Sequence, residues 1–189
     1  MQNKSFTLEE FFTAWVELFQ NFMLENYHVL RTWTGQKDKK WNRDVLRPIV
    51  ERIARNFGLS VVYEQPVPSS KERRDFVLSD ERLGMEILHI EHENSFQDLL
   101  GELIKLQMSR PSYKVGISYA YEHQAREVVD RVISPSVTYS LRSAPEQQWL
   151  FILVIYRIGD KSFTWNRNGA EWSGYLINAK GSGRLTFCP

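Results

Sequence analysis

The sequence is poor in the residues that build covalently stapled or membrane-embedded structures. Its single cysteine, Cys188, excludes a disulfide framework and a structural zinc cluster built from cysteines. The longest apolar run, residues 149–156, is far shorter than the ~20 residues that a membrane helix requires. Near the N-terminus apolar residues alternate with acidic ones, unlike the continuous apolar core of a signal peptide. We therefore expect a cytoplasmic protein without membrane contact.

Short motifs that identify several large enzyme classes are also absent. No glycine-rich loop of the GxxxxGK[ST] or GxGxxG kind occurs, which argues against a nucleotide-driven motor and a dinucleotide-dependent enzyme. No GxSxG motif marks a hydrolase nucleophile. The 24 basic and 23 acidic residues nearly cancel, so no overall field attracts a polyanion or a membrane surface. With 189 residues, 42% of them hydrophobic, the chain has the size of one globular domain, residues 1–189.

Hydrophobic periodicity predicts an α/β fold with a mixed sheet. Residues at helical spacing predict helices over 8–30, 47–57, 96–106 and 122–133. Thr7 with Glu10 forms a capping box for the first helix, and Gly58 ends the second. Alternating or continuous apolar residues predict strands over 60–64, 74–78, 85–93, 113–119 and 148–158, with 65–71 a loop, and a terminal hairpin over 163–177 turning at 168–169. The helix between the strands over 85–93 and 113–119 implies a right-handed crossover and a parallel pair.

The first predicted helix carries an aromatic stripe with two interpretations. Its members recur at helical spacing: Leu8, Phe11, Phe12, Trp15, Leu18, Phe19 and Phe22. The stripe packs either in the core of the domain or against a second copy, because a face this apolar must be buried. A homodimer is thus one candidate assembly. The aromatic residues Trp165, Trp172 and Tyr175 near the C-terminus likewise either stack on nucleic-acid bases or belong to the core.

Charge is segregated along the chain despite the overall balance. Residues 31–55 contain eight basic and three acidic residues, whereas residues 80–102 contain seven acidic residues and a single arginine. Cations beside a carboxylate cluster are what a metal-dependent phosphodiesterase needs, because the cations hold phosphates and the carboxylates hold the metal. The alternative is that both segments are ordinary solvated faces.

Carboxylates in the strand over residues 85–93 are the most informative feature. Glu91 and Glu93 project to one face of a strand that is otherwise apolar enough to be central. Two buried carboxylates repel each other, and a divalent cation such as Mg²⁺ or Mn²⁺ would remove this penalty. Asp75 on the preceding strand is placed to supply a third carboxylate. The alternatives are an exposed strand end for the glutamates and structural roles for His89 and His92.

These residues resemble the PD-(D/E)XK nuclease superfamily. The resemblance rests on Asp75 in RRDFVL and on Glu91-His92-Glu93 in ILHIEHEN, and it covers about residues 44–119. Arg74 stands where a proline is common in that superfamily, and Glu93 stands at its lysine position. Lys105 in the next helix matches members in which the lysine has moved there. The resemblance implies a restriction-endonuclease-like core of a mixed sheet flanked by helices over residues 42–158, with an N-terminal helix and basic loop over 1–41 and a C-terminal hairpin over 159–189.

The resemblance also implies a function and a set of residue roles. It implies hydrolysis of DNA phosphodiester bonds, with DNA favoured over RNA, using Mg²⁺ or Mn²⁺. The metal ligands it implies are Asp75, Glu91, Glu93 and Glu51, and Lys105 would stabilise charge on the phosphate. Residues placed to bind the phosphates are Lys37, Lys39, Lys40, Arg43, Arg73 and Arg74.

A second hypothesis keeps the fold without catalysis, as a module that binds nucleic acid or a protein partner. Glu93 at the lysine position favours it. Under this hypothesis the candidate residues make ordinary ion pairs: Asp75 with Arg73 or Arg74, Glu51 with Arg47 or Arg55, and Lys105 with Glu102.

Overall fold

A computed structural model describes residues 6–26, 42–66, 73–93, 96–121, 124, 127, 129–156 and 171–186. Within these ranges seven strands form one sheet whose spatial order follows the sequence. The strands are β1 (Ser60–Pro66), β2 (Arg73–Asp80), β3 (Met85–Glu93), β4 (Tyr113–Tyr121), β5 (Gln148–Tyr156), β6 (Glu171–Asn178) and β7 (Gly181–Thr186). β3, β4 and β5 are parallel to one another, and the remaining neighbours are antiparallel. The predicted mixed sheet and its parallel pair are confirmed.

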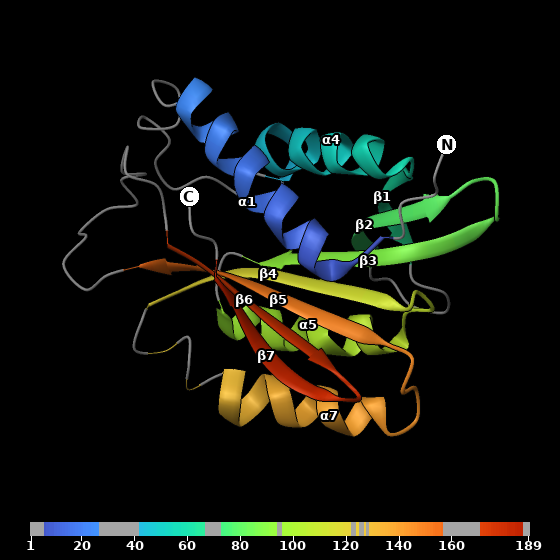
Figure 1. Cartoon of the computed structure of the whole chain (residues 1–189), viewed down its shortest axis with the longest axis vertical. Coiled ribbons are helices and arrows are strands. Elements are labelled where there is room, and N and C mark those ends of the chain that lie inside the picture. Colours follow the sequence, from blue (N-terminus) through green and yellow to red (C-terminus); the bar gives the residue numbers. More distant parts are fainter. Residues whose placement is uncertain are drawn as a thin grey trace.

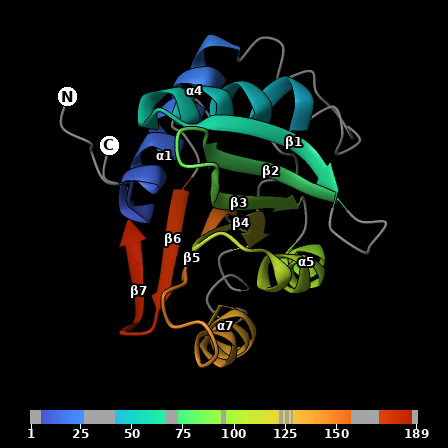
Figure 2. The ribbon, with the colours of Figure 1, turned by 90° about the vertical axis from the view of Figure 1, so that its right-hand side faces the viewer.

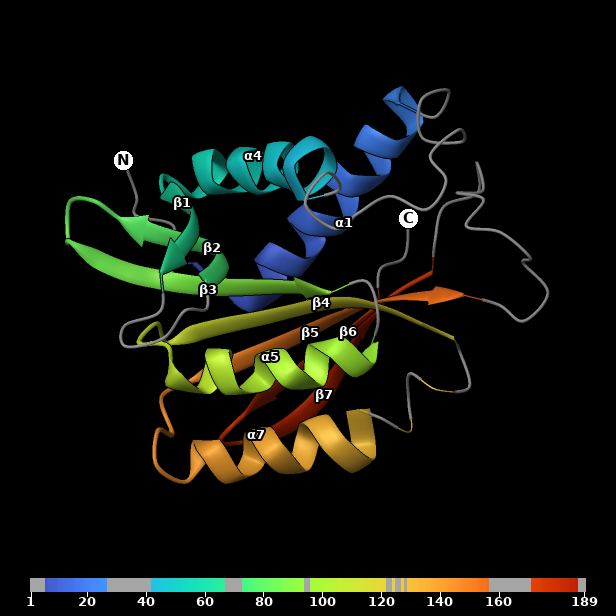
Figure 3. The same cartoon turned by 180° about the vertical axis from the view of Figure 1, so that it is seen from behind.

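Helices cover both faces of this sheet (Figures 1 and 3). The helices α1 (Leu8–Glu25) and α4 (Arg47–Phe57), the latter preceded by a π-helical turn η1 (Asn42–Leu46), lie on one face. On the other face lie α5 (Phe96–Met108) and α7 (Ser134–Leu141), with a second π-helical turn η2 (Val129–Ile133) leading into α7. Figure 2 shows the β1 edge of the sheet beside α4 and the β7 edge beside α1. None of these helices is both long and apolar enough to cross a membrane.

The ends of the first two helices follow from the local sequence. Thr7 Oγ1 accepts the backbone N–H of Glu10 at 3.2 Å, which satisfies one of the free N–H groups of the first turn. Gly58 ends α4 at φ 68°, a left-handed conformation that glycine adopts without steric cost. Both predicted termini are therefore confirmed. α1 ends at Glu25 in place of residue 30.

The aromatic stripe of α1 packs in the core of the domain. Leu8, Phe11 and Trp15 are fully buried. The ring centroids of Phe19 and of Trp172 on β6 are 4.9 Å apart. The core interpretation is thus confirmed for this helix. A dimer built on the stripe is wrong, because the sheet already covers it. Trp172 itself is 4% exposed and belongs to the same core, while Trp165 lies outside the described residues.

Three boundaries differ from the expectations. The terminal hairpin is formed by β6 and β7 and turns after Asn178, because β6 pairs with β5 on one side and β7 on the other. The turn predicted at residues 168–169 lies outside the described residues. β1 continues through Pro66, which an edge strand tolerates because its outer N–H positions need no partner. The helix predicted to end at 133 continues as α7, with Pro135 in its first turn.

Candidate active site

Asp75 and Glu91 lie on neighbouring strands at the point where the β2–β3 ladder ends. The register pairs Phe76 with Ile90, which places Asp75 opposite Glu91. Asp75 Oδ2 accepts the backbone N–H of His92 at 3.0 Å, so a carboxylate takes up a donor of β3 at this point. This hydrogen bond links β2 to β3 just beyond the last backbone pair, Phe76 and Ile90, and it fixes the Asp75 side chain.

Both carboxyl groups lie on the α5 face of the sheet. Leu88 and Ile90 pack in the core under α1 and α4, so Glu91 between Ile90 and His92 points to the other face. Lys105, on α5, confirms this orientation: its Nζ lies 3.7 Å from Glu91 Oε2. Glu91 is 1% exposed. The predicted alternation of this strand is therefore confirmed.

Burial raises the pKa of both carboxyl groups. The pKa of Asp75 rises to about 7 because the group is desolvated and because Glu91 lies nearby, although the His92 N–H and Lys105 oppose the shift. The pKa of Glu91 also rises to about 7 through burial, against the attraction of Lys105. Two carboxyl groups that resist ionisation side by side form a site where a cation is favourable.

His89 and Lys105 hold Glu91 from its two sides. His89 Nε2 lies 2.6 Å from Glu91 Oε1, and both side chains are buried. Burial, with the nearby charges of Arg74 and Lys114, lowers the pKa of His89 to about 3, so its ring is neutral. Lys105 pairs with Glu102 as well as with Glu91, and its Nζ donates to the Arg73 carbonyl at 3.4 Å. Lys105 therefore forms the ion pair with Glu102 that the second hypothesis predicts, and it also lies beside Glu91 in the candidate site.

Glu51 and Glu93 are placed differently from this pair. Glu51 lies on α4, over the opposite face of the sheet, where it accepts Arg47 Nε at 3.1 Å and Tyr63 Oη at 2.6 Å. The Tyr63 hydrogen bond holds the pKa of Glu51 below its ordinary value. The structure thus does not bring Glu51 to Asp75. Glu93 is half-buried at the end of β3, beside Ser118 in the parallel register.

The carboxylate pair offers a small ligand set for a metal. Across the described ranges, no group of three or more His, Cys, Asp or Glu side chains converges closely enough to hold an ion alone. Two carboxylates remain, and Mg²⁺ is commonly held by one or two carboxylates together with waters and substrate phosphates. The donor set therefore fits a hard divalent cation that shares its shell with the substrate.

The residues predicted to bind phosphates are only partly described by the structure, and those that are described form ion pairs. Lys37, Lys39 and Lys40 lie outside the described residues. Arg43 binds the adjacent Asp44 with Nε at 2.6 Å, and Arg73 lies 3.7 Å from Glu64 on the exposed edge.

The prediction that Arg74 binds a phosphate is wrong. It is only 7% exposed, and its Nη1 lies 2.8 Å from Glu86 Oε2. A buried guanidinium paired in this way does not present a free charge to a phosphate. The ion pairs of Arg73 and Arg74 also show that neither forms the surface pair with Asp75 expected under the second hypothesis.

Lys114 is a buried ionisable residue that the sequence analysis missed. Its Nζ donates to the carbonyl and the Oγ of Ser109, both at 2.8 Å, and so caps the C-terminal end of α5. Burial lowers its pKa to about 8, with Arg74 adding to the effect. The sequence signal for this burial is that Lys114 interrupts the apolar run of β4. In the register, Lys114 pairs with His89 on β3.

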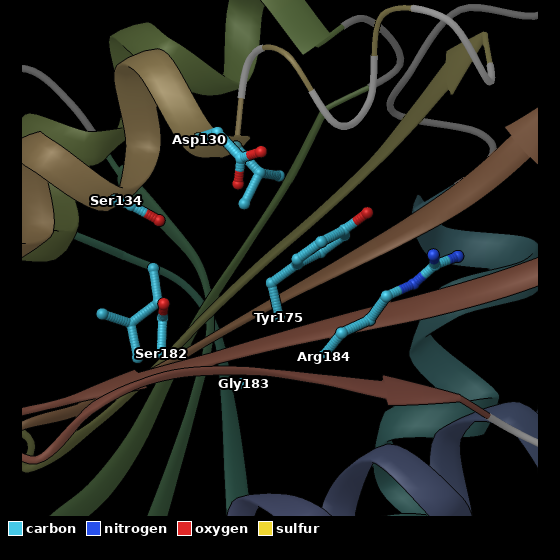
Figure 4. A pocket seen from close by; sticks show the side chains of 8 residues that line it. Asp130, Ser134, Tyr175, Ser182, Gly183 and Arg184 are labelled. Carbon is cyan, nitrogen blue, oxygen red and sulfur yellow. The ribbon is translucent and has the colours of Figure 1, made fainter.

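A separate cavity lies between η2, α7 and the β6–β7 hairpin. It has a volume of about 280 Å³, and Figure 4 shows Tyr175 and Arg184 side by side along it. Arg184 Nη2 donates to Ser173 Oγ at 2.7 Å. The cavity includes Tyr175, which is partly buried against the core on this face, and none of the predicted metal or phosphate ligands.

Neither a protein-family model nor a curated protein matches this chain.

Proposed function

We propose that this chain is a metal-dependent nuclease of the PD-(D/E)XK type, with a restriction-endonuclease-like core, that hydrolyses DNA phosphodiester bonds. One observation carries the proposal. Asp75 and Glu91 meet across β2 and β3 as buried carboxyl groups with raised pKa values, and a lysine from α5 lies beside them. This is the combination of acids and cation that the sequence resemblance implies.

Asp75 and Glu91 would hold the divalent metal ion, Mg²⁺ or Mn²⁺. When bound, the ion would polarise the scissile phosphate and lower the pKa of a bound water. The His92 N–H fixes one oxygen of Asp75, so the group is oriented before an ion arrives. His89 holds Glu91 in the same way from within the sheet. The protein thus supplies a pair of carboxylates that need little rearrangement.

Lys105 would stabilise the phosphate during hydrolysis. A water oxygen forms a bond to phosphorus while the bond to the 3′ oxygen breaks, and negative charge grows on the phosphoryl oxygens. Lys105 Nζ lies within 3.7 Å of Glu91 and is held by the Arg73 carbonyl at 3.4 Å, so its charge is fixed at this position. Glu93, at the end of the same strand, would help to orient the attacking water and would not be a third ligand of the ion.

DNA cleavage tests this proposal directly. We expect DNA to be cut with Mg²⁺ or Mn²⁺ and not with EDTA, and the assay offers both plasmid and single-stranded DNA as substrates. Asp75→Asn and Glu91→Gln each remove an ion ligand and should lower the rate at least about a hundredfold. Glu81→Gln, an exposed acid in the β2–β3 turn, is the matched control and should cut like wild type.

Cleavage that persists in both site variants would reject the assignment. Circular dichroism of each variant establishes that the fold is intact, so a lost activity reports the site.

A second candidate function is a non-catalytic module of the same fold that binds nucleic acid or a protein. The observation in its favour is that both Glu91 oxygens already have protein partners, His89 and Lys105. This candidate predicts that wild type, Asp75→Asn and Glu91→Gln all lack cleavage and all bind DNA equally in a gel-shift assay.

A further inference from the structure

A cavity of about 590 Å³ adjoins the proposed site. It lies between the end of β1, the start of β3 and the C-terminal turn of α5. The side chains that line it include Gln65, Arg74, Met85, Lys105, Met108 and Arg110. Because Lys105 also lies 3.7 Å from Glu91, the cavity and the carboxylate pair share one wall. Its volume is that of a pocket for a small organic ligand.

The polar wall of the cavity is fixed in place. Glu86 accepts Gln65 Nε2 at 3.0 Å on one oxygen and Arg74 Nη1 at 2.8 Å on the other. The charge of Arg74 therefore neutralises that of Glu86, and this wall neither attracts nor repels a charged ligand strongly. Strands β1, β2 and β3 are tied together here, so the cavity exists before a ligand binds.

Two methionines form the apolar part of the rim. Met85 is 56% exposed and Met108 is 68% exposed, and both line the cavity. Long apolar side chains left in water are unfavourable unless something covers them. Methionine is flexible, and its sulfur makes favourable contacts with the edges of aromatic rings. The rim is thus suited to a flat aromatic group.

Positive charge lies beside this apolar rim. Arg110, in the loop between α5 and β4, is exposed, and none of the described residues forms an ion pair with it. Lys105 lies on the side of the cavity toward Glu91. An aromatic ring and an anion are therefore accommodated together, and a nucleotide carries both.

We infer that this cavity binds one unpaired nucleotide of the DNA substrate, with its base against Met85 and Met108 and its phosphate near Arg110. A base inside a duplex is stacked and paired, so it enters a concave cavity only when it is out of the stack. The substrate is then single-stranded DNA or DNA with an unpaired segment. This inference rests on the proposed function for its choice of DNA, and it deepens that function by specifying the state of the strand.

Binding without metal tests the inference apart from catalysis. Fluorescence anisotropy in EDTA would compare a labelled oligodeoxyadenylate with the same strand annealed to its complement. We expect the single strand to bind at least about tenfold more tightly, because unpairing the duplex costs binding energy. Met108→Glu and Arg110→Gln should each weaken single-strand binding about threefold to tenfold.

Ile104→Glu is the matched control. Ile104 is 61% exposed on the same helix, one turn before Met108, and it does not line the cavity. We expect this variant to bind the single strand like wild type, although it carries the same added charge as Met108→Glu. Equal weakening by the two glutamate variants, or equal affinity for the single strand and the duplex, would overturn the inference. Selective single-strand binding without metal-dependent cleavage would reject the nuclease function and leave the cavity assignment standing.

Discussion

The two faces of β3 are equally buried but carry different kinds of side chain. On the α1 face, Leu88 and Ile90 are fully buried among apolar side chains. On the α5 face, His89 and Glu91 are equally buried, but their neighbours are Lys105 and Lys114. Burial is the same on both sides, so the difference lies in chemistry. The α1 face stabilises the fold. The α5 face holds ionisable groups whose burial costs free energy, which is typical of functional sites.

Removing an apolar anchor should have the largest effect on stability. Trp15 is fully buried between Phe11 and Phe19 on the α1 face. Trp15→Ala should lower the free energy of unfolding by about 3–5 kcal/mol, because it removes a large apolar side chain and leaves a cavity. Urea unfolding followed by circular dichroism measures this loss.

Leu24→Ala is the control on the same helix, since Leu24 is 62% exposed. Its change should stay within about 0.5 kcal/mol. Comparable losses in the two variants would show that the α1 stripe does not lie in the core.

Removing a charge from the α5 face should have the opposite sign. The pKa of Asp75 is about 7 in the folded protein, above the ordinary value for aspartate. Between about pH 4 and 7 the folded state therefore holds more protons than the unfolded state, and stability falls as pH rises. Asp75→Asn cannot ionise and should be more stable than wild type by about 1–3 kcal/mol at pH 8 in EDTA.

Thermal or urea unfolding at pH 4 and pH 8 would measure this effect. The two proteins should differ least at pH 4, where the wild-type group is protonated. If the Asn variant is less stable at pH 8, the Asp75 carboxylate stabilises the fold, and the electrostatic account of the α5 face is wrong.

Lys114 provides a second pH-dependent test on the same face. Its lowered pKa of about 8 means that the folded state releases its proton before the unfolded state does. Wild type should therefore gain stability relative to Lys114→Met as pH rises from 8 to about 10.5, by about 1–3 kcal/mol. Urea unfolding of both proteins at these pH values measures this change in their stability difference. A difference that is constant with pH would mean that Lys114 is charged throughout and that burial is compensated.

The fold was largely predictable because its strands and helices are strongly patterned. The bounds of β3 match the expectation, since residues 85–93 form a largely apolar stretch that directly follows the turn over residues 81–84. β7 was missed because Gly181 and Gly183 lower its strand propensity, whereas the Asn-Gly pair upstream is a strong turn signal. Local sequence thus predicted elements wherever propensity and packing agree.

The candidate site was predictable only in part, because it depends on contacts between distant segments. Asp75 and Glu91 are brought together, as the strand alternation suggested, and Lys105 lies beside them, as the resemblance implied. The burial of Arg74 depends on Glu86 from another strand, and helix spacing could not exclude Glu51. Which face of the sheet a helix covers is a tertiary property that a pattern along one element does not contain.

Binding of manganese to the carboxylate pair tests the central claim most directly. Calorimetric titration of Mn²⁺ into the full chain near neutral pH should show a saturable site in wild type and in Glu81→Gln. Asp75→Asn and Glu91→Gln should each weaken that site by about tenfold or more. An absence of binding to wild type, or the same binding in all four proteins, would contradict the claim that Asp75 and Glu91 form a metal site.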